Sequence, residues 1–468
     1  MSFTPRCGDA LTQGQTRWSA LLRTVPKSVL VSVLARACTA GELTKEGVAS
    51  RMHMALGKRW RWIPGLARRF VADFETGTRP SFRGARKFIR RDAQFDRAWR
   101  RNRREIQIAQ WIPEPQAMQP VAAAASWPLP QLETIDELCA LLDVTAGELE
   151  WLADLRGSVE RSDEHRLQHY WYRIVRKSSG GLRLIEAPKV KLKQVQRLVL
   201  RGILEKIPMH PFVHGFVSGR SVQSFAAPHV GKEYVLRMDL EDFFPSIHAA
   251  RIQAMFRTIG YPDRIASLLT GLCTNMAPRP LWRNSRTDAS MQERMHARGL
   301  YSSPHLPQGA PTSPALANVC AYRMDCRLTG LARAVGADYS RYADDLVFSG
   351  GDRLAALLRD MPAYVAAIAA EQGFSVNHHK TRVMSQAIRQ RIAGVVVNRR
   401  LNIRREDFDR LKAILTNCRR HGPASQNRQD HPSFAAHLRG RVEWVRSLNP
   451  TRGERLSKVY DQIDWSGT

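Results

Sequence analysis

The chain has 468 residues, 43% of them hydrophobic, which is enough for two or three domains with cores of their own. Its 72 Lys and Arg against 43 Asp and Glu give a formal net charge of +29, which indicates nucleic acid as partner, although a basic host proteome or a membrane surface would also explain it. The sequence contains no apolar run long enough to span a membrane, no signal-peptide core and no CxxC pair among its seven cysteines, so we expect a cytoplasmic protein without a membrane partner, zinc site or disulfide framework.

Residues 1–110 read as a basic, mainly helical N-terminal extension. Residues 51–110 alone hold 17 Lys and Arg against five Asp and Glu, and aromatic residues interleave with these bases in "GKRWRWIPGLARRF" and "KFIRRDAQFDRAWRRNRR". Arg and Trp together suit phosphate contact with base stacking. The alternative is a small helical bundle in which Trp60, Trp62, Phe70 and Phe74 are core residues, and both interpretations can hold at once.

Residues 111–131 are rich in Pro and Ala and read as a linker. Residues 132–208 follow as a helical lead-in and a hairpin. Thr134 with Glu137 predicts a capping box at a helix start, and we expect Gly147 to break that helix and Glu148 to begin another. The segment "HYWYRIVRK-SSGG-LRLIEAP" predicts two strands joined by a turn, and "KVKLKQVQRLVLRGIL" a basic amphipathic helix.

Residues 209–400 alternate strands and helices irregularly, and residues 401–468 read as helical and basic. We expect a buried strand in "YVLRMDLEDFFPSI", one long helix in "SPALANVCAYRMDCRLTGLARAVG", a strand–turn–strand in "DYSRYADDLVFSG" and a further hairpin in "RIAGVVVNRRLNI". Irregular alternation with antiparallel hairpins indicates the α+β class, with helices on one face of the sheet.

Three aspartates stand at the ends of these strands: Asp239, Asp344 and Asp345. Each is flanked by apolar residues and is therefore expected to be partly buried, which is costly for a carboxylate without a cation. Magnesium prefers oxygen ligands and leaves positions open for water and phosphate, and two ions ~4 Å apart can activate a hydroxyl and stabilise a leaving pyrophosphate. An exposed Asp-Asp turn is the alternative interpretation.

The segments "MDLEDFF", "PQGAPTSP", "YADD" and "NHHK" follow one another in an order that resembles the palm of reverse transcriptases, and the resemblance covers about residues 165–465. It implies a right-hand polymerase with fingers, a palm with an antiparallel sheet and a helical thumb, after the N-terminal extension. The activity implied is that of an RNA-directed DNA polymerase, which adds deoxynucleoside triphosphates with two Mg²⁺ ions.

The resemblance implies a role for individual residues. The metal ions would be held by Asp239, Asp344, Asp345 and the main chain of Leu240, and Lys380 would protonate the pyrophosphate. Phe244 would exclude a ribose 2′-hydroxyl. The remaining nucleotide contacts would come from the finger hairpin, the strand end and the loop before a helix, namely Lys177, Arg183, Asp242, Phe243, Gln308 and Gly309.

Other stretches resemble the retron enzymes of bacteria, most of all the N-terminally extended myxobacterial type: "HGFVSGRSV", "LLDVTAGELEWLA" and "HLRGRVEWVRSLNPTRGERL". Two elements depart from the retron pattern. The Asn-Ala-x-x-His element reads Phe225-Ala226-Ala227-Pro228-His229, without the Asn, and the Val-Thr-Gly element reads Ile392-Ala393-Gly394. The resemblance implies RNA contacts at His229, Gly394, Arg404, Arg405, Arg439 and Arg441; a generic duplex-gripping thumb would explain the arginines equally well.

A retron enzyme is thereby expected to copy part of a structured noncoding RNA into branched single-stranded DNA, known as msDNA. The RNA and its DNA product would be partners, priming would use an RNA 2′-hydroxyl, and the role would be antiphage defence with an effector protein as a further partner. Two alternatives stay open at this point: a non-retron bacterial reverse transcriptase, defence-associated or diversity-generating, and an RNA-binding scaffold or antitoxin-like partner.

Overall fold

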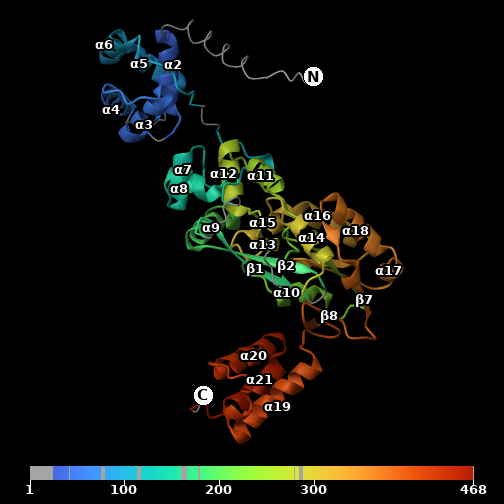
Figure 1. Ribbon diagram of the computed structural model, residues 1–468. Helices are drawn as coiled ribbons and strands as arrows, with labels where there is room; N and C mark the ends of the chain where they lie inside the picture. The colour runs from blue at the N-terminus through green and yellow to red at the C-terminus, as the bar shows by residue number, and fades with distance from the viewer. Residues whose placement is uncertain are drawn as a thin grey trace, which may run out of the picture. The chain divides into compact units, whose positions relative to one another are not determined.

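The computed structural model describes residues 25–41, 43–74, 80–112, 117–159, 166–177, 180–278, 280–283 and 288–466 (Figure 1). The chain forms two compact units: Met1–Ser126 with Pro130–Ala153 and Phe256–Leu269, and Trp127–Leu129 with Asp154–Met255 and Thr270–Thr468. The domain boundaries expected from the sequence stay predictions. Within the described ranges, none of the helices combines the length and the apolar character needed to cross a bilayer.

The first unit begins with a helical bundle around one apolar core. Its helices are α2 (Lys27–Thr39), α3 (Lys45–Leu56), α4 (Ile63–Phe74), α5 (Phe82–Arg91) and α6 (Ala93–Asn102). Side chains of Thr44, Ser81 and Asp92 accept hydrogen bonds from the first-turn amides of α3, α5 and α6, as N-caps do. Trp60 and Phe70 are buried in the core, where Trp62 and Phe74 pack against them. The four aromatic residues therefore serve the bundle core.

The rest of the first unit holds a short 3-10 turn, η1 (Ala122–Ala124), and two helices, α7 (Ile135–Leu142) and α8 (Ala146–Ala153). The capping box of Thr134 and Glu137 is confirmed. The expected break at Gly147 is wrong, because α7 ends at Asp143 in the left-handed conformation and Gly147 lies inside α8. At the start of α8 the amide of Thr145 donates to the Glu148 carboxylate, and the amide of Glu148 donates to the Thr145 hydroxyl oxygen. A second capping box therefore defines the start of α8.

Part of the Pro- and Ala-rich segment is held by main-chain hydrogen bonds. The amides of Gln119 and Val121 donate to the carbonyls of Gly260 and Thr258 over 2.9 and 3.2 Å. These carbonyls lie where α11 (Ala249–Thr258) leads into α12 (Asp263–Cys273). Residues 113–116 lie outside the described part of the chain.

The second unit is built on an antiparallel sheet, as expected. Its strands are β3 (Tyr234–Glu241), β4 (Asp338–Tyr342), β5 (Asp345–Gly350), β6 (Ser375–Val376) and β7 (Arg382–Ser385), and β3 pairs with β5, β6 and β7. The finger hairpin forms a separate two-stranded sheet from β1 (Tyr170–Arg176) and β2 (Leu182–Pro188). Asp239 lies directly opposite Asp345 in the register of β3 and β5, so the central pairing sets the distance between predicted site residues.

Helices and short 3-10 turns precede, connect and follow the strands of this sheet along the chain. They are α9 (Val190–Gly202), η2 (Leu204–Lys206), α10 (Val222–Ala226), η3 (Ala227–His229), α13 (Pro280–Arg283), α14 (Met291–Leu300), α15 (Ser313–Cys320), α16 (Tyr322–Ala334), α17 (Asp352–Ala355), α18 (Met361–Glu371) and η4 (His378–Lys380). The single long helix expected from Ser313 onward is divided at Ala321. This residue is the C-cap of α15, with a ψ of −3°, and α16 begins directly after it.

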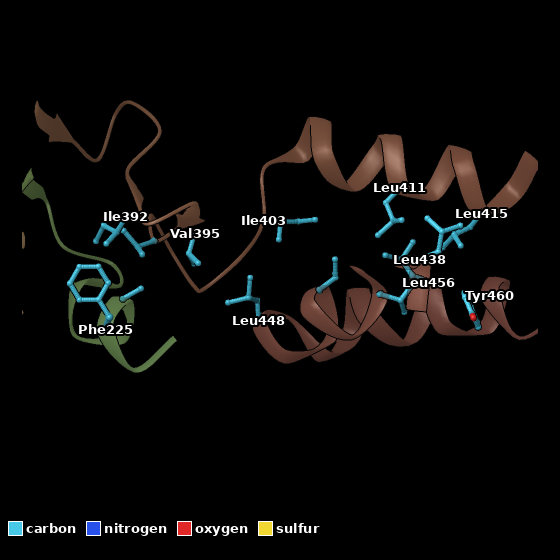
Figure 2. Packing of buried hydrophobic residues seen from close by; sticks show 14 of the residues in the cluster. Phe225, Ile392, Val395, Ile403, Leu411, Leu415, Leu438, Leu448, Leu456 and Tyr460 are labelled. Carbon is cyan, nitrogen blue, oxygen red and sulfur yellow. The ribbon is translucent and has the colours of Figure 1, made fainter. Parts of the chain in front are cut away.

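The C-terminal helices share an apolar core with the hairpin that precedes them. This hairpin is β8 (Arg391–Ile392) and β9 (Val395–Val396), and the helices are α19 (Arg405–His421), α20 (Phe434–Leu448) and α21 (Pro450–Tyr460), with η5 (Pro423–Ser425). Figure 2 shows the core as a row from Phe225, Ile392 and Val395, through Ile403 and Leu448, to Leu411, Leu415, Leu438, Leu456 and Tyr460 between the helices. The expectation of helices after residue 405 is confirmed.

Candidate active site

Three carboxylates meet where β3 and β5 pair. Asp239 and Asp345 are opposite each other, and the amide of Leu240 donates to the carbonyl of Asp344 over 2.9 Å. Burial, with the nearby carboxylates of Asp239 and Asp345, raises the pKa of Asp344 to about 6. Burial also raises the pKa of Asp345, although the Arg237 guanidinium acts in the opposite direction. The site thus concentrates negative charge in a poorly solvated corner of the sheet.

The turn that carries Asp344 has a strained backbone. Ala343 adopts a φ of 55°, in the left-handed region that L-residues rarely occupy. A Cβ on Gly215 would lie 2.5 Å from the Ala343 nitrogen, so only glycine permits the close approach of that segment to the turn. The Arg341 guanidinium donates to the Ala343 carbonyl over 3.0 Å. Packing and hydrogen bonding therefore hold the turn in one conformation.

Two of the carboxylates already have cationic partners within the protein. Lys380 Nζ lies 2.9 Å from Oδ2 of Asp239, and Arg237 donates twice to Oδ1 of Asp345, over 2.9 and 2.6 Å. Among the residues that the structure describes, no basic side chain lies within ion-pair distance of Asp344. Asp344 is therefore the carboxylate whose charge most needs an external cation.

A cavity of about 580 Å³ opens beside these carboxylates. Most of the residues expected from the sequence line it: Lys177, Arg183, Asp239, Leu240, Asp242, Phe243, Phe244, Gln308, Asp344 and Lys380. Asp345 and Gly309 do not line it. Asp345 faces Arg237, and a Cβ on Gly309 would meet the Glu186 carbonyl at 2.8 Å, so Gly309 allows its loop to approach β2.

One wall of the cavity is cationic and comes from the finger hairpin. Lys177 Nζ lies 2.5 Å from Oδ1 of Asp242, whose backbone is also left-handed, with a φ of 46°. Phe243 is buried beneath the Arg341 guanidinium, whereas Phe244 is half-buried and reaches the cavity. The cavity lining thus combines carboxylates, cationic side chains and an aromatic side chain.

The chain is similar to known polymerases over most of its length. The family described as "Reverse transcriptase (RNA-dependent DNA polymerase)" matches residues 175–406. The retron Mx65 reverse transcriptase of Myxococcus xanthus is 40% identical over 344 residues, or 72% of this chain and 73% of that protein. The chain belongs to the retron reverse transcriptases. The retron Ec86 reverse transcriptase of Escherichia coli is 31% identical over 301 residues, 63% of this chain and 81% of that protein.

Family membership identifies the class of enzyme. The chain is an RNA-directed DNA polymerase, which takes an RNA template and makes a DNA product. The expected α+β polymerase fold and the expected resemblance to myxobacterial retron enzymes are confirmed at this level. The retron Mx162 reverse transcriptase of Myxococcus xanthus adds a second myxobacterial relative, 32% identical over 72% of this chain and 68% of that protein.

The carboxylate oxygens at the cavity of this reverse transcriptase are the type of ligand that magnesium prefers. Magnesium binds through one or two carboxylates and keeps positions for water and substrate phosphate, and Asp239 and Asp344 supply two carboxylates at an open cavity. The described residues include no group of three or more His, Cys, Asp or Glu side chains arranged to hold a metal ion, and Asp345 is paired with Arg237. A third carboxylate ligand would require that ion pair to open.

Sequence reasoning missed the residues that support the site of this reverse transcriptase from behind. Arg341 is fully buried and forms a bidentate ion pair with Asp325, over 2.7 Å for both bonds, and it also contacts Asn318. Asn318 in turn donates to the Gly215 carbonyl over 2.8 Å. Arg237 stands two residues before Asp239 and thus on the same face of β3. That spacing could have predicted that Arg237 lies near the carboxylates, whereas no sequence pattern predicts the ion pair between Arg341 and Asp325.

A second buried network ties the finger hairpin to the loop of Gln308. His305 Nε2 lies 2.9 Å from Oε2 of Glu186, and both side chains are fully buried. Asn275 donates to the other oxygen of Glu186 over 2.8 Å, and the amide of Glu186 donates to the Gln308 carbonyl over 2.9 Å. β2 and the Gln308 loop are therefore held to each other at the edge of the cavity.

His229 does not fit the RNA contact expected for it. Its side chain is fully buried, with Nδ1 2.7 Å from Oγ of Ser349 and Nε2 2.6 Å from Oγ of Ser340. The imidazole therefore presents no surface to RNA and instead ties η3 to β4 and β5. Burial lowers the pKa of His229 to about 3.

Because His229 is buried, we expect it to make the free energy of unfolding depend on pH. Its pKa is about 3 in the folded protein and about 6.5 in an unfolded chain, so its contribution is complete above pH 6.5 and is lost as pH falls. Between pH 7 and 5 the free energy of unfolding should decrease by about 2 kcal/mol through this residue. His229→Gln, which does not titrate, should lose that part of the dependence in urea unfolding at both pH values. Equal pH dependence in the two proteins would contradict this.

The other RNA candidates lie at the hairpin turn and on the thumb helices. Ala393 and Gly394 both have positive φ, as the two-residue turn between β8 and β9 requires. Arg404 is held by both oxygens of Asp407, whereas Arg405 is exposed and lies 3.5 Å from Asp409. Arg439 pairs with Glu443 and Asp461, and Arg441 is half-buried on the same helix. Their roles in RNA binding stay predictions.

Proposed function

We propose that this retron reverse transcriptase copies part of a structured noncoding RNA into branched single-stranded DNA. Synthesis begins from a 2′-hydroxyl of the RNA, and the DNA stays attached to it. The observation that carries the catalytic part is the cavity in which Asp239 and Asp344 face Lys177 and Arg183. Membership of the retron family supports this proposal. The proposal also includes a role in antiphage defence with an effector protein as partner.

In this proposal two magnesium ions are held by Asp239, Asp344 and Asp345, with the main-chain carbonyl of Leu240. When bound, they promote attack by the hydroxyl and stabilise the charge of the leaving pyrophosphate. Lys380 and Arg237, which neutralise Asp239 and Asp345 here, are the groups that must yield to such ions. Lys380, which lines the same cavity, would then hold a proton at Nζ for the pyrophosphate.

The nucleotide lies between the carboxylates and the finger hairpin. Lys177 and Arg183 bind the triphosphate through charge-assisted hydrogen bonds, and the amides of Asp242 and Phe243 face it from the strand end. Gln308 contacts the base or the template, and the buried pair of Glu186 and His305 keeps that loop in place.

Phe244 should decide between deoxyribose and ribose. It lines the cavity and is half-buried, and its phenyl ring offers no hydrogen-bond partner for a 2′-hydroxyl. We expect Phe244→Ala to raise the kcat/KM ratio of a ribonucleotide over its deoxynucleotide by ~10- to 100-fold, because the clash is removed. Single-nucleotide addition on a defined primer–template measures that ratio. An unchanged ratio would place ribose selection elsewhere.

Analysis of the nucleic acid attached to the purified protein tests the proposed function. The protein is expressed with its upstream genomic segment, and the bound nucleic acid is sequenced before and after treatment with a 2′,5′-debranching enzyme. The proposal requires short DNA that only debranching separates from RNA, and none with the Asp344→Asn variant. DNA joined to protein, or DNA with no RNA branch, would support a non-retron reaction instead.

A further inference from the structure

The helices α5 and α6 carry a second basic surface, away from the residues of the active site in the sequence and in a different unit. We define the cationic face as the exposed Lys and Arg side chains of residues 83–104. On α5 they are Arg83, Lys87, Arg90 and Arg91, which recur at the spacing of one helix face. On α6 and just after it, Arg97, Arg100, Arg101 and Arg104 repeat the same spacing, and Arg103 is exposed beside them.

Among the residues that the structure describes, the acidic side chains Asp92 and Asp96 of this segment pair with only one base of the cationic face, Arg100. Asp92 is bound by both guanidinium donors of Arg69 over 2.7 and 2.9 Å and caps the amide of Phe95. Asp96 pairs with Lys27 and with Arg100. Within the described residues, the bases of α5 named above have no carboxylate within ion-pair distance. The face thus keeps nearly all of its charge.

The cationic face carries no exposed large apolar side chain. The aromatic residues Phe82, Phe88 and Trp99 are partly buried and pack against the core of the bundle, and no large apolar side chain among the described residues 80–104 is in the exposed class. A membrane-binding helix inserts apolar side chains, and a protein interface is built on an apolar centre. A face whose exposed side chains are mainly guanidinium and ammonium groups suits a phosphate backbone better than either partner.

Neutral polar side chains of the same segment already make hydrogen bonds within the protein. Ser81 accepts from the amide of Gly84, Gln94 accepts from Arg69, and Asn102 donates to the Ala98 carbonyl. These are the residue types, besides Arg, that read base edges. Contacts at this face would therefore be with phosphates, which recognise the position and shape of a backbone rather than its sequence.

We propose that the cationic face binds the phosphate backbone of a base-paired part of the noncoding RNA. The inference rests on the proposed function for the identity of the RNA, and on the residues of α5 and α6 for the existence of the surface. The bundle would then hold the RNA independently of the active site, so the polymerase would keep its template RNA even when the growing DNA end leaves the cavity.

The test uses the full chain and two charge-matched variants. The first replaces Arg83, Lys87, Arg90 and Arg91 with Gln, which preserves helix propensity. The control replaces four exposed arginines of the second unit with Gln: Arg323, Arg333, Arg353 and Arg359. Affinity for the noncoding RNA is measured from 50 to 300 mM KCl, and circular dichroism melting checks that each variant folds. If the first variant does not fold, Arg97, Arg101 and Arg104→Gln replaces it.

The first variant should bind the RNA ~10- to 100-fold more weakly at 150 mM KCl, and the slope of log K against log salt should fall by about 3. The control should change both quantities much less. Extension of a short DNA primer on an RNA template should proceed at the normal rate in both variants, so the outcome is separate from the proposed polymerase function. The proposal would be overturned if both variants lost RNA affinity equally, or if the first variant bound the RNA as tightly as the unmodified protein. It would also be overturned if, with a DNA duplex of the same length measured in parallel, the first variant lost affinity only for that duplex.

Discussion

Asp344→Asn should lower the rate of DNA synthesis by at least ~10³-fold, which corresponds to about 4 kcal/mol of transition-state stabilisation. Asp344 lines the cavity and has no basic side chain of the described chain at ion-pair distance, so its charge is available for a cation. Asparagine keeps the shape and removes the charge. Single-turnover extension of a primer on an RNA template, with saturating magnesium and nucleotide, measures the loss.

The same variant should remain folded and bind RNA normally. Burial and neighbouring carboxylates raise the pKa of Asp344 to about 6, so its ionised form destabilises the fold at neutral pH. Removing the charge should therefore leave the unfolding midpoint unchanged or higher in the absence of divalent metal. A folded variant that still makes DNA would contradict the role given to Asp344. A variant that loses DNA synthesis while the cell keeps its phage resistance would favour the scaffold alternative.

Arg341→Ala should destabilise the protein by about 3–5 kcal/mol, because it leaves the carboxylate of Asp325 buried and unpaired. Both side chains are fully shielded from water, and the Tyr339 hydroxyl also donates to Asp325. The change also removes the donor to the Ala343 carbonyl, so the turn of Asp344 loses one of its supports. Urea unfolding measures the stability, and kcat at low temperature measures the effect on the turn.

The double variant Arg341→Met/Asp325→Leu separates the two effects. It replaces the buried ion pair with apolar side chains and should recover much of the stability lost in Arg341→Ala. The Ala343 carbonyl still lacks its donor, so kcat should stay low in the stable double variant. Recovery of both stability and kcat would show that Arg341 contributes only to folding. Full stability of Arg341→Ala would contradict the burial argument itself.

The sequence predicted those parts of the fold that local patterns specify. The finger hairpin, the strand of Asp239, the hairpin of Asp344 and the capping box at Thr134 each depend on neighbouring residues, and the structure has them all. Asp239 and Asp344 were expected to converge because both lie at strand ends. The antiparallel register of β3 and β5 brings them together.

The remainder depends on contacts between residues that are far apart in the chain. Arg237 neutralises Asp345 only because β3 and β5 pair in one particular register, and a shift by one residue would separate them. His229 was expected to contact RNA, but it is buried in the core, where it contacts Ser340 and Ser349, more than a hundred positions later. The tryptophans of the basic extension fitted two interpretations until the bundle core was visible.

The proposed function depends most on Asp239 and Asp344 holding divalent metal beside the nucleotide. Crystals of the protein with primer, RNA template, a non-hydrolysable deoxynucleotide and Mn²⁺ allow the metal to be located by its anomalous scattering. We expect Mn²⁺ between the carboxylates of Asp239 and Asp344, against the triphosphate held by Lys177 and Arg183. Nucleotide bound in the cavity with no manganese at these carboxylates, or manganese bound elsewhere in the chain, would contradict it.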